Sequence, residues 1–182
     1  ALERADSATV AVQLITDLID TIGQGGSGHD PALVPGGRSY WNAFLVVDGA
    51  SGYVIDTSGR EWAVEQFTDT RAISNRTSVA GFDEVHRHPR QPVERLVDPR
   101  WSASKSVLAD RPVTLGSLAA HLRSHDSCAE AGWSVCMHVA DVEVTTSSMI
   151  AALRPDGGSE VWWLTGSPCE HEYRRSLLGP LA

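Results

Sequence analysis

The chain has 182 residues, 42% of them hydrophobic and 21% charged, which is typical of a folded globular protein and excludes a disordered tail. Its formal net charge of −8 argues against a nucleic acid as partner. No apolar run approaches the roughly 20 residues of a membrane-spanning helix, and we recognise no signal peptide. We therefore expect a cytoplasmic protein with a single domain spanning residues 1–182.

The first 22 residues predict an amphipathic helix. Apolar side chains from Val10 to Ile22 recur at a spacing close to 3.6, and Gly23 ends the pattern. We recognise no capping residue at its start. The following residues, 23–37, are rich in Gly and Pro and predict a loop.

Residues 39–75 predict an antiparallel meander of three or four short strands. Residues 41–48 carry apolar side chains on both faces, residues 53–57 form the second strand of a hairpin, and residues 61–67 alternate. A short fourth strand over 71–75 ends at Asn75. Close spacing of the strands favours antiparallel pairing.

The region between residues 76 and 111 has no stable period and contains several prolines, so we expect a long loop. It is rich in arginine and holds the chain's one lysine, Lys105. These cations either bind a substrate carboxylate, which a guanidinium can hold by two hydrogen bonds, or form a solvated charged loop.

The last third of the chain begins with a helix over residues 113–125, for which Thr114 is the predicted cap. Strands follow over residues 133–139, 144–153 and 160–165, with a hairpin turn at Asp156-Gly157-Gly158. Alternating helices and antiparallel strands predict a layered α+β domain.

Two pairs of possible metal ligands stand two residues apart: His86 with His88, and Cys136 with His138. A metal site needs three or four convergent ligands, and neither pair has a third ligand at a spacing typical of metal-binding motifs. The three cysteines, Cys128, Cys136 and Cys169, include no Cys-x-x-Cys pair. We therefore expect a charged loop and a core strand here, without a metal.

A cysteine hydrolase is a further alternative, with Cys136 or Cys169 as the nucleophile and His138 as the base. Cys136 lies in a predicted core strand, which favours a buried structural thiol. Cys169 follows Ser-Pro in a predicted turn, so a role for its thiol stays open. Activity retained in Cys169→Ser would dismiss this alternative.

Several stretches, in this order, resemble the secernin and C69 dipeptidase family of N-terminal nucleophile (Ntn) hydrolases. They cover nearly the whole chain: ALERA with AVQLITDLIDTIGQGG, YVIDTSGREWAVEQ, RAISNR, LGSLAAHLRSHD, SVCMH, TTSSMIAAL and WLTGSPC. The resemblance implies an αββα sandwich of two antiparallel sheets between helices, and an enzyme that hydrolyses amide bonds in small peptides without a cofactor.

The resemblance also implies roles for particular residues. Asn75 matches the strand-end amide that donates a hydrogen bond to the oxyanion in this group of enzymes. Basic residues that follow it are expected to bind the substrate; we expect Arg76, Arg100 and Lys105 to fill that role.

The nucleophile of the family is an N-terminal cysteine whose own α-amine serves as the base. None of the three cysteines matches it, so we expect the nucleophile to come from outside this chain. The sheets would then be incomplete, which predicts a second chain or a homo-oligomer. A non-catalytic relative, acting as a binding or assembly module on the same scaffold, is the alternative.

Overall fold

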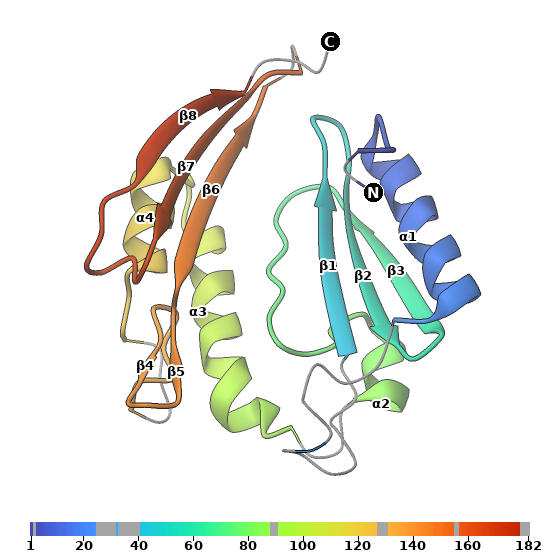
Figure 1. The fold of residues 1–182 in the computed structure, drawn as a ribbon, viewed down its shortest axis with the longest axis horizontal. Coiled ribbons are helices and arrows are strands. Elements are labelled where there is room, and N and C mark those ends of the chain that lie inside the picture. The colour runs from blue at the N-terminus through green and yellow to red at the C-terminus, as the bar shows by residue number, and fades with distance from the viewer. Residues whose placement is uncertain are drawn as a thin grey trace. The chain divides into compact units, whose positions relative to one another are not determined.

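A computed structural model describes residues 1, 3–24, 32, 41–87, 91–126, 131–154 and 157–178. They form two compact units, the first made of Ala1–Asp69 with Ile73–Gln91 and the second of Thr70–Ala72 with Pro92–Ala182. Both units combine helices with an antiparallel sheet, so the chain has a mixed α+β fold, as the sequence predicts (Figure 1). Within the described ranges, no helix combines the length and the apolar character that a membrane span requires.

The sheet of the first unit is the predicted meander. Its strands β1 (Trp41–Val47), β2 (Gly52–Ser58) and β3 (Glu61–Phe67) pair antiparallel in the order β1-β2-β3. The hairpin β1–β2 runs from the pair Trp41–Ser58 to the pair Val47–Gly52. The predicted hairpins are confirmed.

The central strand β2 is buried on both faces, and its alternating side chains meet different neighbours. Val54 packs with Val79 and Phe82 in the hydrophobic core of this unit. On the opposite face, the Tyr53 hydroxyl hydrogen-bonds the hydroxyl of Thr9. The sheet therefore lies between the first helix and the segment that follows β3, because successive side chains of a strand point to opposite faces.

The first helix, α1, spans Ala8–Ile22 and ends at Gly23, whose φ of 77° suits glycine. Its start differs from our expectation: Ser7 caps it, accepting a hydrogen bond from the amide of Val10. Arg60, in the turn between β2 and β3, donates to the carbonyl oxygens of Asp20 and Thr21 and so holds the helix end to the sheet.

The predicted fourth strand over residues 71–75 is wrong. Only an isolated bridge between Ser74 and Arg76 forms there. The chain instead crosses β2, where the buried Asp56 carboxylate accepts hydrogen bonds from the amides of Ser78 and Val79, and continues into α2 (Phe82–His86). Buried backbone amides need hydrogen-bond acceptors, and here the carboxylate supplies them in place of the carbonyl groups of a neighbouring strand.

The second unit begins with helices where we expected a long loop, and that expectation is wrong. A π-helical turn, η1 (Val93–Val97), leads into α3 (Asp98–Ala109), with Pro99 in the first turn where its missing N–H costs no hydrogen bond. α3 has no buried residue and therefore no apolar stripe that the sequence could reveal. The next helix, α4 (Leu115–Leu122), is confirmed, with Thr114 and Ser117 forming a capping box.

The second sheet has the order β6-β7-β8, with β6 at Ser147–Leu153, β7 at Ser159–Thr165 and β8 at Arg174–Leu178. A short pair, β4 (His138–Val139) and β5 (Glu143–Val144), precedes it. The predicted β6–β7 hairpin is confirmed, although Asp156 of its turn lies outside the described residues. Most of the strand predicted over 133–139 is wrong, and β8 was not predicted.

Candidate functional site

Asn75, the predicted oxyanion donor, lies in the first unit, in the segment between β3 and α2, and not at the end of a strand as the resemblance implies. It is exposed, whereas its backbone is held from two sides. The amide of Arg76 donates to the carbonyl of Ser74 at 2.7 Å, and the Gln91 side-chain amide donates to the carbonyl of Asn75 itself. The exposed side chain is therefore carried by a fixed stretch of backbone.

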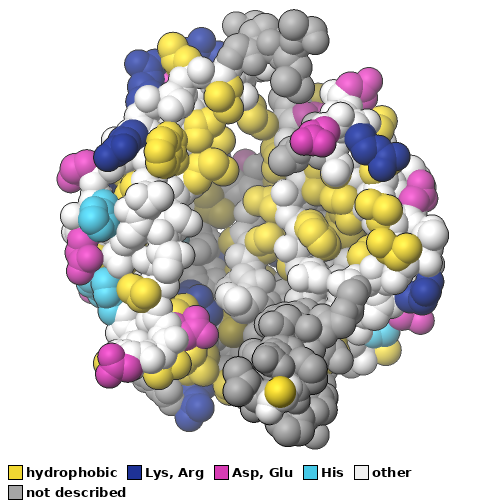
Figure 2. All heavy atoms as spheres, in the orientation of Figure 1, with side chains coloured by type: hydrophobic (Ala, Val, Ile, Leu, Met, Phe, Trp, Pro, Cys, Tyr) yellow, Lys and Arg dark blue, Asp and Glu magenta, His cyan; other side chains and the backbone are white. Residues whose placement is uncertain are grey.

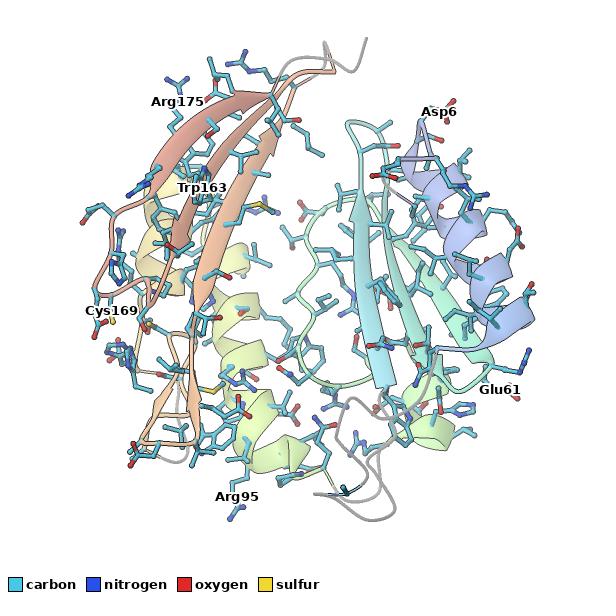
Figure 3. All side chains as sticks on the ribbon, in the orientation of Figure 1. Asp6, Glu61, Arg95, Trp163, Cys169 and Arg175 are labelled. Atoms are coloured by element: carbon cyan, nitrogen blue, oxygen red, sulfur yellow. The ribbon has the colours of Figure 1, made fainter. Side chains whose placement is uncertain are left out.

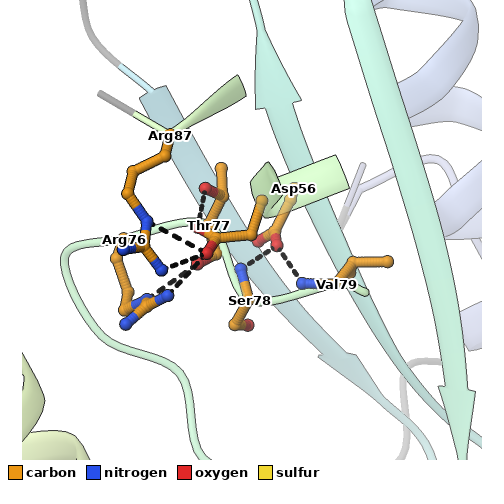
Figure 4. A network of polar contacts seen from close by, with 7 residues as sticks. Asp56, Arg76, Thr77, Ser78, Val79 and Arg87 are labelled. Atoms are coloured by element: carbon orange, nitrogen blue, oxygen red, sulfur yellow. Dashed lines mark hydrogen bonds and ion pairs between the residues drawn. The ribbon is translucent and has the colours of Figure 1, made fainter. Parts of the chain in front are cut away.

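Arg76, a predicted substrate-binding residue, is engaged in a buried network (Figure 4). Its guanidinium lies 2.7 Å from the Asp83 carboxylate, and only 9% of its side chain is exposed. Arg87 and the Thr77 hydroxyl bind the same carboxylate, at 2.6 and 2.7 Å. Burial by itself would raise the pKa of Asp83, but the hydrogen bonds from Arg87 and Thr77 and the two positive charges outweigh it and lower that pKa.

The other two predicted substrate-binding residues, Arg100 and Lys105, both lie on α3 in the second unit. Arg100 is half-buried and donates to the carbonyl of Leu96 at 3.0 Å. Burial lowers the pKa of its guanidinium, and the charge of Glu143 opposes that shift. Lys105 is exposed, with its ammonium 3.7 Å from the centre of the Trp101 ring.

A cluster that the sequence did not predict lies in the second unit. We refer to the side chains of His125, Cys136, His138 and Cys169 as the His/Cys cluster. One nitrogen or sulphur atom of each residue lies within 4.8 Å of those of the others. The ring nitrogen Nε2 of His138 is 3.5 Å from the sulphur of Cys136 and 3.1 Å from that of Cys169. These are four potential ligands of a soft metal ion.

Three separate segments bring the cluster together. His125 follows shortly after the end of α4. The carbonyl of the preceding residue, Ser124, accepts a hydrogen bond from the amide of Cys136 at 3.0 Å. His138 opens β4, and its amide donates to the carbonyl of Gly132, also at 3.0 Å. Cys169 lies in the connection between β7 and β8 (Figure 3).

The two thiols of the cluster have different surroundings. Cys136 is buried, and Cys169 is exposed at the surface of the unit. Burial raises the pKa of the Cys136 thiol; a backbone hydrogen bond from Cys169 opposes that shift, and the adjacent Cys169 thiol adds to it. Without a metal, Cys136 is therefore a neutral thiol at pH 7 and a poor nucleophile.

A cavity of about 430 Å³ adjoins the cluster, lined by His125, Gly132, Ser134, His138, Cys169 and Glu170. The exposed side of the cluster therefore opens to solvent, which gives an ion a path of entry. Glu170 adds a carboxylate to its rim.

Only two of the four residues of the His/Cys cluster could be recognised as a pair from the sequence. Cys136 and His138 stand two residues apart, but His125 and Cys169 reach them only through the tertiary fold. The other predicted pair is undecided, because His88 lies outside the described residues, while His86 stacks on Phe82.

No protein-family model matches the sequence. The resemblance to the secernin and C69 dipeptidase family therefore stays a prediction that depends on the residues quoted above.

Proposed function

We propose that this sequence is part of an amide-bond hydrolase of the Ntn type, in which Asn75 donates to the oxyanion and a nucleophile from outside the described chain attacks. The observation that carries the proposal is the exposed Asn75 side chain on a backbone fixed from both sides. Two antiparallel sheets with helices, as found here, are also the components that an αββα sandwich requires.

The role of Asn75 follows from the chemistry of amide hydrolysis. Attack on the carbonyl carbon turns the carbonyl oxygen into an oxyanion, which needs hydrogen-bond donors that are already in position. A side-chain amide supplies an N–H donor without carrying a charge. A fixed backbone reduces the reorganisation needed when the negative charge develops.

Lys105 is the exposed cation among the predicted substrate-binding residues. Arg76 already has Asp83 as an ion-pair partner, and Arg100 is half-buried. We therefore propose Lys105, ahead of Arg100 and Arg76, as the cation accessible to a carboxylate.

The test uses the whole protein that carries this sequence, assayed for amine release from a panel of dipeptides. We expect Asn75→Ala to lower kcat by roughly 10²–10³, the loss typical of removing one oxyanion donor, with unchanged thermal stability. Asn75→Asp, which keeps the shape but loses the donor, should be impaired to a similar extent.

The matched control is Gln66→Ala, which removes an exposed side-chain amide from β3 of the same unit and should leave kcat unchanged. Equal turnover in Asn75→Ala and the control would rule out the oxyanion role. Absence of any amide hydrolysis by the whole protein would favour the non-catalytic binding module instead.

A further inference from the structure

We propose that His125, Cys136, His138 and Cys169 form a Zn²⁺ site that ties together three segments of the second unit. Zinc is commonly held by four cysteine and histidine side chains in tetrahedral sites of this composition. The proposal is independent of the amide-hydrolase proposal above, because it depends on different residues and different contacts.

The distances in the cluster are those of ligands around one ion. Zinc lies about 2.3 Å from sulphur and about 2.0–2.1 Å from nitrogen, so tetrahedral ligands are about 3.3–3.8 Å from one another. The two nitrogen–sulphur distances from His138, 3.5 and 3.1 Å, lie at or slightly below this range. All four ligand atoms fall within 4.8 Å, so small side-chain shifts complete the tetrahedron.

Hydrogen bonding alone does not account for this convergence. The Nε2 atom of a neutral imidazole has either one proton or one lone pair, so it makes one good hydrogen bond. Here it faces two sulphur atoms at once, and His125 joins them with its ring centre 5.1 Å from that of His138. An ion at the common point would coordinate all four of these side chains at once.

The chemistry of the ligands selects zinc over harder ions. Two thiolates and two imidazoles suit a borderline-soft cation, whereas Mg²⁺ and Ca²⁺ prefer oxygen ligands. Binding releases the two thiol protons, and two thiolates neutralise the charge of Zn²⁺. Four protein ligands leave no open position for water, so the site is structural rather than catalytic.

The surrounding backbone holds the ligands in place. The Ser134 hydroxyl donates to the carbonyl of Cys136 at 2.6 Å, and the Arg123 guanidinium donates to the carbonyl of Pro168, next to Cys169, at 2.9 Å. Gly132 has a φ of 85°, and a side chain there would collide with the carbonyl of His138. Such partners around the ligands typically set metal affinity.

A Cys169–His138 catalytic pair is the competing explanation, because 3.1 Å is within reach for proton transfer from the thiol. That explanation does not account for the Cys136 thiol and the His125 imidazole, which lie in the same cluster. The two explanations differ in how Cys169 reacts: a zinc-bound thiolate is protected from alkylation, and an activated catalytic thiolate is alkylated fast.

The experiment measures bound metal in the purified chain by mass spectrometry of the elements, followed by titration of chelated protein with Zn²⁺ and Co²⁺. We expect one zinc per chain, and the visible spectrum of tetrahedral thiolate-bound cobalt after substitution. Removing zinc with a chelator should lower the midpoint of thermal unfolding, since a structural metal binds the folded state.

The variant Cys169→Ser removes an exposed ligand, so misfolding should not complicate it. Its zinc affinity should fall by more than roughly 10–100-fold, which is the loss typical of removing a residue that only hydrogen-bonds to a metal ligand. The matched control is His171→Ala, which removes an exposed imidazole two residues away and should keep one zinc per chain.

Three results would overturn the proposal. The first is a chain without bound zinc that also fails to take up Zn²⁺ or Co²⁺ in titration. The second is zinc affinity that falls equally in Cys169→Ser and His171→Ala. The third is fast alkylation of Cys169 that a chelator does not change, which is the result expected of the catalytic pair.

Discussion

At the scale of single residues, the buried carboxylate of Asp83 joins the two polypeptide segments on either side of it. It accepts hydrogen bonds from Arg76, Thr77 and Arg87, the three residues that Figure 4 labels around it. Its side chain is only 13% exposed. Removing one member of such a buried pair costs more than the pair contributes, because the remaining charge stays buried without a counter-charge. Arg76 is the buried cation that would lose its ion pair with Asp83.

We therefore expect Asp83→Asn to lower the free energy of unfolding by about 3 kcal/mol at pH 7. Folding lowers the pKa of Asp83 below its ordinary 3.8, so the stabilisation is present above that pH and is lost as the pH falls further. In urea unfolding between pH 7 and pH 3, the free energy of unfolding should fall more steeply with decreasing pH in the wild type than in the variant. Glu84→Gln, which changes the exposed carboxylate next to Asp83, is the control; an equal effect there would contradict the network.

At the scale of elements, the segment leading into β4 depends on the close approach of two backbone stretches. The amide of His138 donates to the carbonyl of Gly132, whose φ of 85° is costly for any residue with a Cβ. This approach sets the position of His138 relative to the other members of the His/Cys cluster. A side chain at Gly132 would have to displace backbone rather than a flexible side chain.

We therefore expect Gly132→Ala to lower the free energy of unfolding by about 3 kcal/mol, at the upper end of the usual range for point substitutions. Gly59→Ala is the matched control, because Gly59 also has a positive φ, of 66°, but has open space where a Cβ would lie. It should cost only about 1–2 kcal/mol. Equal losses in urea unfolding would show that the close approach at His138 does not matter.

At the scale of the whole molecule, one face of the β6–β8 sheet is apolar and is not covered by the described residues of the second unit. α4 contacts β6, and Ile150 and Leu164 are buried on one face of the sheet. The pairing register places Met149, Leu153, Trp163 and Leu178 together on the opposite face. All four are exposed, Met149 by 65%, and hydrophobic side chains are visible over this sheet in Figure 2. A patch of this kind usually binds another protein surface.

This face sharpens the prediction of a second chain or homo-oligomer. We expect sedimentation of the isolated chain at micromolar concentration to show more than one chain per particle, and Met149→Lys to shift the distribution towards the monomer. Val142→Lys, which changes an exposed apolar residue outside the sheet, should have no such effect. A well-folded monomer at this concentration would refute the prediction.

Several elements could be predicted from the sequence because their signals are local. The apolar spacing of α1 and its end at Gly23, the β1–β2–β3 meander, the cap at Thr114 and the β6–β7 hairpin all follow from periodicity and from cap and turn chemistry. Elements without such signals were missed: α3 has no apolar stripe, and β8 follows a polar segment.

Contacts between residues far apart in the sequence became visible only in the folded structure. The His/Cys cluster needs His125 after α4, the pair at β4 and Cys169 between β7 and β8, and no local pattern links positions that far apart. The same holds for Arg76, whose partner Asp83 lies across a chain reversal. Local propensity acts over a few residues, whereas ligand and ion-pair geometry arise from packing between segments, which one sequence does not display.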